Sequence, residues 1–444
     1  MKMKIDKLYA AAKAAGIAPF ESRITTENKI TVSTFNTDIE NYTVAENSSI
    51  KVRGLIDGKC GVFSSDRVDD GVIELAVKSV KESAEFGQPV DPEFFINGGE
   101  SYEKVDTYSA ELAKTPAAKL IEIAKSISAK ALALDKRVEL ASVEVEYSYG
   151  STALKNSNGL DVKSETDYCM IFGSCKAKSG EQVESGSHYE ILRSLEHFDE
   201  SAFAQSLVAD AVGRLGGESV ASGKYKVVYS PGCVAALLSA LGGAYSAFNL
   251  EQHISLLEGK MGTQVFSELL TIARTPIGDE PFCKAFDAEG VPCHNSLLVD
   301  KGVPTGFVYD LATAKRAGVK STGSGRLEGG NVRPAVGFIT VEKGERDLEG
   351  LFGFIGDGLY IDDLGGIATG INGQSGDYSL QAAGYVIKGG KRVRPVSLIT
   401  VASNIMTDLK NIVAVGNDEK LTAYGIKTPS FAITDISVSG VNEK

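Results

Sequence analysis

The side chains best suited to catalysis or metal binding stand in one short segment, at Cys283, Cys293 and His294. A thiol beside an imidazole can act as a nucleophile, and the same groups can hold zinc. Adjacent side chains on a strand point to opposite faces, so Cys293 and His294 would rarely bind one ion. We therefore expect packing residues here and keep a Cys–His pair as an alternative. The other histidines stand apart in the sequence: His188, His197 and His253.

Two acidic pairs, Asp287/Glu289 and Asp362/Asp363, could serve as general acid–base groups. For the first pair we favour a turn over residues 286–290. In such a turn the acids accept hydrogen bonds from backbone donors, and the final glycine supplies an unusual φ.

Recognisable catalytic motifs are absent from the sequence. The nucleophile-elbow, P-loop and HExxH patterns do not occur. Glycine-rich loops at 365–366 and 373–376 could let a ligand approach the backbone closely, although bends in a sheet explain them equally well.

Composition restricts the class of protein. The 444-residue chain is 43% hydrophobic and 23% charged, as expected for a globular protein of two or three domains. Its net charge of −12, without a dense Lys/Arg run, argues against nucleic acid and anionic membranes as partners. No apolar signal segment opens the chain, and the six cysteines form no CxxC pair. We therefore expect reduced thiols and a cytoplasmic location.

Local patterns predict an α+β protein with a mixed N-terminal region and a β-rich, glycine-rich C-terminal domain. We expect an α/β segment at 1–90 and a second at 91–222, in the same lobe after a linker at 88–109. The C-terminal domain then covers 223–444. Within its 302–390 stretch lie 21 of the 48 glycines, which is typical of a curved antiparallel sheet with tight turns.

Several N-terminal elements follow from spacing and turn residues. Apolar residues at helical spacing predict a helix over 73–84, and Thr115-Pro116 predicts the cap and first turn of another. Alternation predicts a half-buried strand over 143–149. The other expected features are hairpin turns at Asp57-Gly58 and Asn158-Gly159, a helix over 200–215 and a strand over 224–230.

An uncharged stretch runs from Val227 to Leu250. Pro231 can start a helix there, but serines, glycines and an asparagine make a membrane span a poor interpretation. We expect a buried helix whose small residues allow another backbone or a partner subunit to approach closely.

Motifs spread over the chain resemble those of the TldD/PmbA family, whose members are also described as modulators of DNA gyrase. The similarity includes the strand–hairpin pattern near 50–61 and the Asn158-Gly159 turn. Order and spacing in the C-terminal half make it specific. The motifs there are the Pro231-Gly232 helix, FDAEGVP (286–292), Gly302-Val303, STGSGR (321–326), SGDYSLQAAGYVIKGGK (375–391) and IVAVGND (412–418).

The resemblance implies a two-subunit metalloprotease that processes or degrades peptides. In the TldD type, the helix after the Pro-Gly turn carries HExxxH, which supplies two zinc ligands and a general base, and a cysteine near the C-terminus completes the site. Here Ala236 and Leu241 stand where the histidines would be, and Leu237 where the glutamate would be. No cysteine follows Cys293. The sequence therefore matches the PmbA (TldE) type, which lacks the zinc motif.

The resemblance implies no catalytic or metal-binding residue and no cofactor in this chain, with zinc only in a TldD-type partner. The expected partners are that subunit, or a second copy of this chain, and an extended peptide. Two alternatives remain at this stage: an autonomous peptidase built on Cys283, Cys293 and His294, and a non-enzymatic regulatory binding protein.

Overall fold

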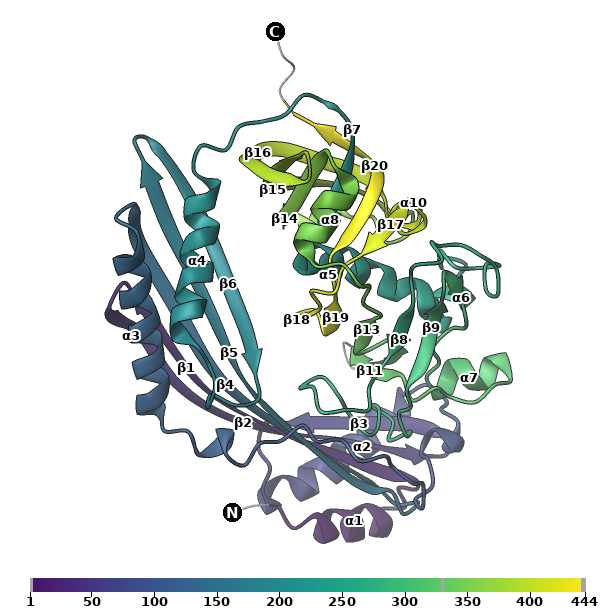
Figure 1. The fold of residues 1–444 in the computed structure, drawn as a ribbon. Helices are drawn as coiled ribbons and strands as arrows, with labels where there is room; N and C mark the ends of the chain where they lie inside the picture. Colours follow the sequence, from purple (N-terminus) through teal and green to yellow (C-terminus); the bar gives the residue numbers. More distant parts are fainter. Residues whose placement is uncertain (1–2, 329–330, 441–444) are drawn as a thin grey trace.

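A long curved sheet wraps around a β-rich domain in the computed structural model, which describes residues 3–328 and 331–440 (Figure 1). The expected α+β architecture is confirmed. No helix of the described residues is long and apolar enough to cross a bilayer.

The N-terminal sheet is antiparallel and draws its strands from both sides of the 88–109 segment. Its order is β3-β2-β1-β4-β5-β6, and long regular pairings such as that of β4 with β5 hold it together. The expected turns at Asp57-Gly58 and Asn158-Gly159 are confirmed. The strands are β1 (Phe20–Phe35), β2 (Asp38–Ile56), β3 (Lys59–Ser65), β4 (Val138–Asn156), β5 (Asp161–Ser179) and β6 (Gln182–Leu192).

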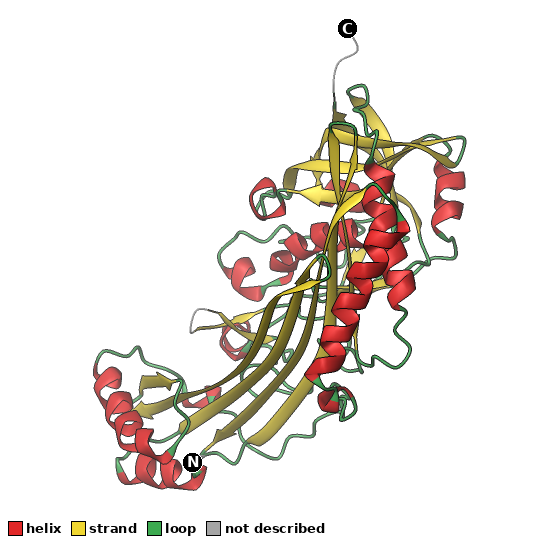
Figure 2. Ribbon diagram, turned by 90° about the vertical axis from the view of Figure 1, so that its left-hand side faces the viewer, coloured by secondary structure: helices red, strands yellow, loops and turns green. Residues whose placement is uncertain are grey.

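Four helices pack on this sheet (Figure 2). Phe20 and Val32 share one face of β1 because they are an even number of residues apart. Phe20 packs in the core under α1 and α2, and Val32 packs in the core under α3 and α4. The opposite face carries Glu21 and Arg23, and it turns toward the C-terminal domain. The helices are α1 (Ile5–Ala14), α2 (Ile73–Glu85), α3 (Ala117–Leu134) and α4 (Glu200–Arg214).

The start of α3 differs from the prediction by one residue. Pro116 itself occupies the cap position with extended backbone, and no side chain caps the helix, so Thr115 is not the N-cap. Leu134, the last residue of α3, is 47% exposed. The helix ends there, so no neighbour covers its side chain.

The C-terminal domain contains a sheet that closes on itself, because β16 pairs with β20 as well as with β15. Most pairings are antiparallel as expected, but β7 and β14 run parallel. The strands are β7 (Gly223–Tyr229), β14 (Gly358–Gly365), β15 (Asp377–Lys388), β16 (Lys391–Asn404), β17 (Ile412–Val415) and β20 (Phe431–Ser439).

A second six-stranded sheet and several short helices complete this domain. The sheet order is β10-β9-β8-β13-β19-β18, with β13 and β19 parallel. Its strands are β8 (Ile272–Arg274), β9 (Ser296–Asp300), β10 (Val303–Pro304), β13 (Ile339–Val341), β18 (Lys420–Thr422) and β19 (Ile426–Thr428). The remaining elements are hairpin β11 (Gly325–Glu328) and β12 (Asn331–Pro334), with helices α5 (Pro231–Leu241), α6 (Ala247–Glu251), α7 (Leu311–Ala317), α8 (Leu348–Ile355), α9 (Ile367–Gly370) and α10 (Ile405–Lys410).

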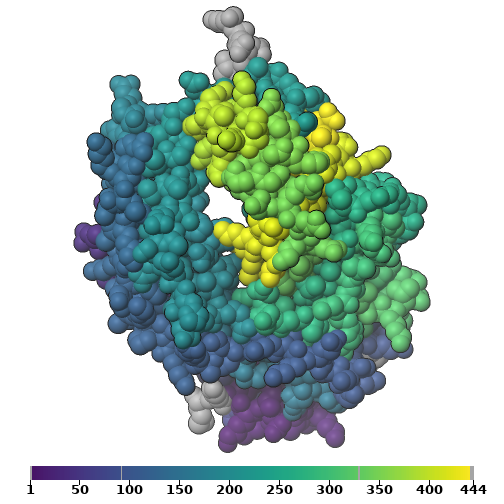
Figure 3. Space-filling model, in the orientation of Figure 1, coloured from purple at the N-terminus to yellow at the C-terminus, as the bar shows by residue number. Residues whose placement is uncertain are grey.

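The two regions meet at separate places and leave an opening between them, visible in the space-filling view (Figure 3). On one side of it, Lys420 of β18 lies 4.6 Å from the ring centre of Tyr189 on β6. Elsewhere, Arg214 of α4 pairs with Asp362 of β14 at 3.2 Å. Charged and aromatic contacts, rather than one continuous apolar core, join the regions here.

Candidate functional site

Helix α5 forms the centre of the C-terminal domain and begins as the sequence predicts. The Ser230 side chain accepts a hydrogen bond from the N–H of Cys233 at 3.4 Å, and Pro231 occupies the first turn. Its residues are apolar on nearly every side, which is the pattern of a fully buried helix. The expected burial is confirmed. The helix stops at Leu241, however, and Gly242–Tyr245 continue as a 3-10 turn before α6.

Ala236, Leu237 and Leu241 are buried, with 4%, 6% and 2% of their surfaces exposed. Leu237 packs beside Tyr229 and Asp408 at a small void, whereas Leu241 faces a large cavity. Alkyl side chains offer no lone pair to a metal, so these positions cannot ligate zinc.

Cys233 is the one residue of α5 with a metal-donor side chain of the His, Cys, Asp or Glu type. Burial raises the pKa of its thiol well above the ordinary value, which disfavours the thiolate that binds zinc. Within residues 3–328 and 331–440, no group of three or more His, Cys, Asp or Glu residues could hold a metal ion. The residues present do not fit a zinc site.

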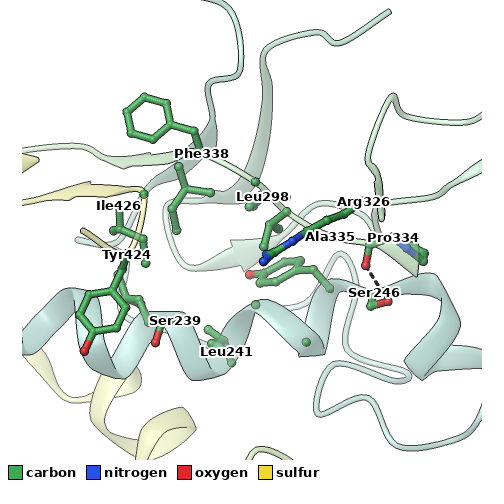
Figure 4. A pocket seen from close by; sticks show the side chains of 18 of the residues that line it. Ser239, Leu241, Ser246, Leu298, Arg326, Pro334, Ala335, Phe338, Tyr424 and Ile426 are labelled. Carbon is green, nitrogen blue, oxygen red and sulfur yellow. Dashed lines mark hydrogen bonds between the residues drawn. The ribbon is translucent and has the colours of Figure 1, made fainter. Parts of the chain in front are cut away.

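The large cavity lies along the C-terminal half of α5 and has a volume of about 790 Å³. Figure 4 shows Ser239 and Leu241 on the helix, Leu298, Phe338 and Ile426 across from them, and Arg326 extending between. The whole lining comprises Leu238, Ser239, Leu241, Gly242, Gly243, Tyr245, Ser246, Phe248, Asn249, Ile272, Phe282, Lys284, Leu298, Arg326, Glu328, Arg333–Ile339 and Ala423–Ile426. An apolar hollow with a few polar groups is the usual form of a ligand pocket.

Three cations line this cavity. Arg326 lies 3.6 Å from the carboxylate of Glu328, and the guanidinium of Arg333 lies 4.1 Å from the ring centre of Phe248. The ammonium of Lys284 makes no ion pair or hydrogen bond with any described residue. Burial lowers the pKa of Lys284. Cys293 and Asp287 oppose this shift, and the nearby Arg274 and Arg326 add to it.

Tyr245 adds an unpaired polar group to the wall. Only 3% of this residue is exposed, and its hydroxyl has no hydrogen-bond partner among the described residues. Leaving a buried hydroxyl unpaired costs about 1–3 kcal/mol. A ligand that accepts or donates a hydrogen bond in the cavity would remove that cost.

The structure does not join Cys283, Cys293 and His294 into a catalytic group. The Cys293 thiol is fully buried and donates to the carbonyl of Gly323 at 3.2 Å. The Cys283 thiol donates to the carbonyl of Thr275 at 3.5 Å, and burial raises its pKa to about 11. The side chain of His294 is 63% exposed, and its Nδ1 faces Glu103 at 3.1 Å. Each side chain has its own separate partner.

The turn predicted at 286–290 is confirmed. Asp287 accepts hydrogen bonds from the N–H groups of Glu289 and Val291 at 2.8 and 3.0 Å, and Gly290 has a φ of 84°. A side chain at Gly290 would come within 2.7 Å of Leu160. The turn therefore packs against the N-terminal sheet, and both acids are buried.

The second acidic pair also has a structural role in the fold. The side chain of Asp362 on β14 is 18% exposed, and burial raises its pKa to about 6. Arg214 lies 3.2 Å from Asp362, 2.8 Å from Asp210 and 4.0 Å from Asp363. The guanidinium of Arg214 therefore forms ion pairs with three carboxylates at the junction of the two regions.

Two models of one protein family match this chain. A model of the PmbA/TldA metallopeptidase C-terminal domain matches residues 222–440, and one of the central domain of the same family matches 110–215. The chain belongs to the PmbA/TldD family.

Relatives of the PmbA/TldD family match nearly the whole length. Metalloprotease PmbA of Escherichia coli O157:H7 is 25% identical over 93% of this chain and 90% of its own. A crystal structure of a candidate DNA gyrase modulator from Thermotoga maritima has a TM-score of 0.90 at 28% identity, with 98% and 99% of the two chains covered. TldE from Thermococcus kodakarensis has the same fold, with a TM-score of 0.89 at 21% identity over 98% and 100%.

Sequence reasoning missed the polar residues of the cavity. Lys284 and Arg326 stand at the edges of the motifs FDAEGVP and STGSGR, which is the one signal that could have drawn attention to them. Tyr245 lies inside the uncharged stretch, where nothing in the sequence sets it apart. Only the folded chain shows that these three side chains border one hollow.

Proposed function

We propose that this chain is the PmbA/TldE-type, non-catalytic subunit of a TldD/PmbA peptidase complex. The observation that carries the proposal is α5, where Ala236, Leu237 and Leu241 are buried in apolar surroundings at the positions of the family's metal motif. Zinc and the general base would come from a TldD-type partner, and zinc would supply the activated water there.

The contribution of this chain is to bind peptide. Its cavity beside α5 is of the size that encloses a small ligand, with apolar walls and few polar groups. Strand β18 is an edge of its sheet, and Ala423 and Tyr424, which follow it directly, line the cavity. An extended peptide can add to such an edge through backbone hydrogen bonds. The free state of all six cysteines agrees with the reducing cytoplasm in which we place the complex.

Metal content and cleavage together test this proposal. We expect the purified chain, alone or as a homodimer, to contain no stoichiometric zinc and to leave unfolded peptides intact. Mixing it with a TldD-type subunit that carries an intact HExxxH should give cleavage that a chelator abolishes. One tightly bound zinc per copy of this chain, or cleavage by the chain alone, would overturn the assignment.

A further inference from the structure

The charges around the α5 cavity do not balance. Lys284 forms no ion pair with a described residue. The charge of Asp287 favours its charged form, and the nearby Arg274 and Arg326 disfavour it. Arg274 donates its N–H groups to backbone carbonyls and so offers nothing to a ligand. Like charges held together out of water repel strongly, and an anion between them relieves the repulsion.

Among residues 3–328 and 331–440, no carboxylate forms an ion pair with Lys284. Asp287 is the acidic residue whose charge raises the pKa of Lys284. Its oxygens, however, already accept hydrogen bonds from the backbone N–H groups of Glu289, Val291 and Gly325. Glu328 stands exposed and pairs with Arg326 at 3.6 Å. The ammonium of Lys284 is therefore left for an external partner.

The remainder of the cavity suits the apolar part of a ligand. Leu238, Leu241 and Phe338 line it, and its 790 Å³ exceed what a single anion would need. The unpaired hydroxyl of Tyr245 can donate a hydrogen bond to an anionic oxygen. The wall thus combines the cations Lys284, Arg326 and Arg333 with one hydroxyl donor and an apolar surface.

We propose that the α5 cavity is a carboxylate-binding pocket, in which Lys284 and Arg326 hold a carboxylate of a peptide while an apolar neighbour packs on α5. This deepens the peptide-binding role and rests on it. The carboxylate can come from the peptide's C-terminus or from an acidic side chain, and both present the same group to the two cations.

Binding to the isolated full-length chain tests this inference without partner or zinc. The probe is an N-terminally labelled, alanine-rich pentapeptide ending in leucine, as free acid and as C-terminal amide, followed by fluorescence anisotropy. Two further amides carry glutamate or glutamine at the fourth position. We expect the free acid to bind about tenfold to a hundredfold more tightly than the plain amide. If the amide that carries glutamate binds as tightly as the free acid, the pocket binds acidic side chains.

Variants test whether the preference for the free acid over the amide depends on the cations of the cavity. Lys284→Met should reduce the preference for acid to less than threefold, Arg326→Gln should weaken it, and Lys284→Arg should retain most of it. Lys391→Gln removes an exposed lysine outside the cavity and serves as the matched control. If Lys284→Met does not fold by circular dichroism, Arg326→Gln decides the test.

Equal binding of the free acid and all three amides would overturn the inference, as would a preference for the carboxylate that survives Lys284→Met and Arg326→Gln. Failure of the reconstituted complex to cleave peptides would instead count against the proposed function and leave these binding results unaffected.

Discussion

The carboxylate of Asp287 accepts a hydrogen bond of 2.7 Å from the backbone N–H of Gly325, 38 residues further along the chain. This contact fastens the buried 286–290 turn to the base of hairpin β11–β12, next to Arg326. The same turn contacts the N-terminal region, because the Tyr102 hydroxyl donates a hydrogen bond to the carbonyl of Gly290 at 2.8 Å. The 286–290 turn therefore links the N-terminal region to the wall of the cavity.

Asp287→Asn should destabilise the protein by about 1–3 kcal/mol, because the amide has one acceptor oxygen for three backbone donors. Urea unfolding measures the change. Asp66→Asn removes an exposed carboxylate and should leave the free energy of unfolding within about 0.5 kcal/mol of the original. Equal effects of the two substitutions would show that the Asp287 contacts contribute little.

Glu289 should make stability depend on pH. Burial, and then the charge of Asp287, raise its pKa from the ordinary 4.5 to about 8. The folded state therefore holds this proton more tightly than the unfolded state. Its contribution to stability is complete below pH 4.5, falls as the pH rises toward 8, and is lost above that.

Glu289→Gln should accordingly flatten the profile of unfolding free energy between pH 5 and 8, by up to about 1.4 kcal/mol per pH unit. Urea titrations at several pH values measure the slopes. Glu139→Gln, at an exposed position, should leave the slope unchanged. A profile of the Gln variant parallel to the original would contradict a raised pKa at this site.

Leu237→Glu, which places a glutamate where the family resemblance puts that of the metal motif, should destabilise the chain by about 3–5 kcal/mol at pH 7. The new carboxylate would be buried near Asp408, which is buried itself and whose pKa burial raises to about 6. Leu237→Met keeps the volume and apolar character and should cost less than about 1.5 kcal/mol. Thermal and urea unfolding compare the two, and similar stabilities would mean that water reaches this side of α5.

Arg214→Met should loosen the junction of α4 with β14, because it leaves the buried Asp362 without its cation. We expect a loss of about 3–5 kcal/mol, and partial recovery in the double variant Arg214→Met/Asp362→Leu. Unfolding free energies around this double-mutant cycle give the coupling. Additive losses in the double variant would show that the pair does not join the two regions energetically.

Local signals predicted most elements of the N-terminal region. Asp57-Gly58 and Asn158-Gly159 supplied positive φ where the hairpins needed it, and the apolar spacing from Ile73 to Ala84 matched α2. The sequence did not predict where α5 ends. A run without charges has no marked boundary, so the change to a 3-10 turn at Gly242 followed from packing rather than from composition.

The sequence by itself determined what α5 cannot do. The side chains of alanine and leucine at positions 236, 237 and 241 carry no lone pairs in any fold, so the absence of side-chain metal ligands at these positions follows from the sequence. The tertiary structure alone decided what stands beside the helix. Lys284, Tyr245 and Arg326 are separated by up to 81 residues, and their shared cavity arises because the 3-10 turn, the 275–295 loop and hairpin β11–β12 converge in space. The spacing of residues along the chain cannot predict that these side chains lie together, because their proximity depends on contacts between segments distant in the chain.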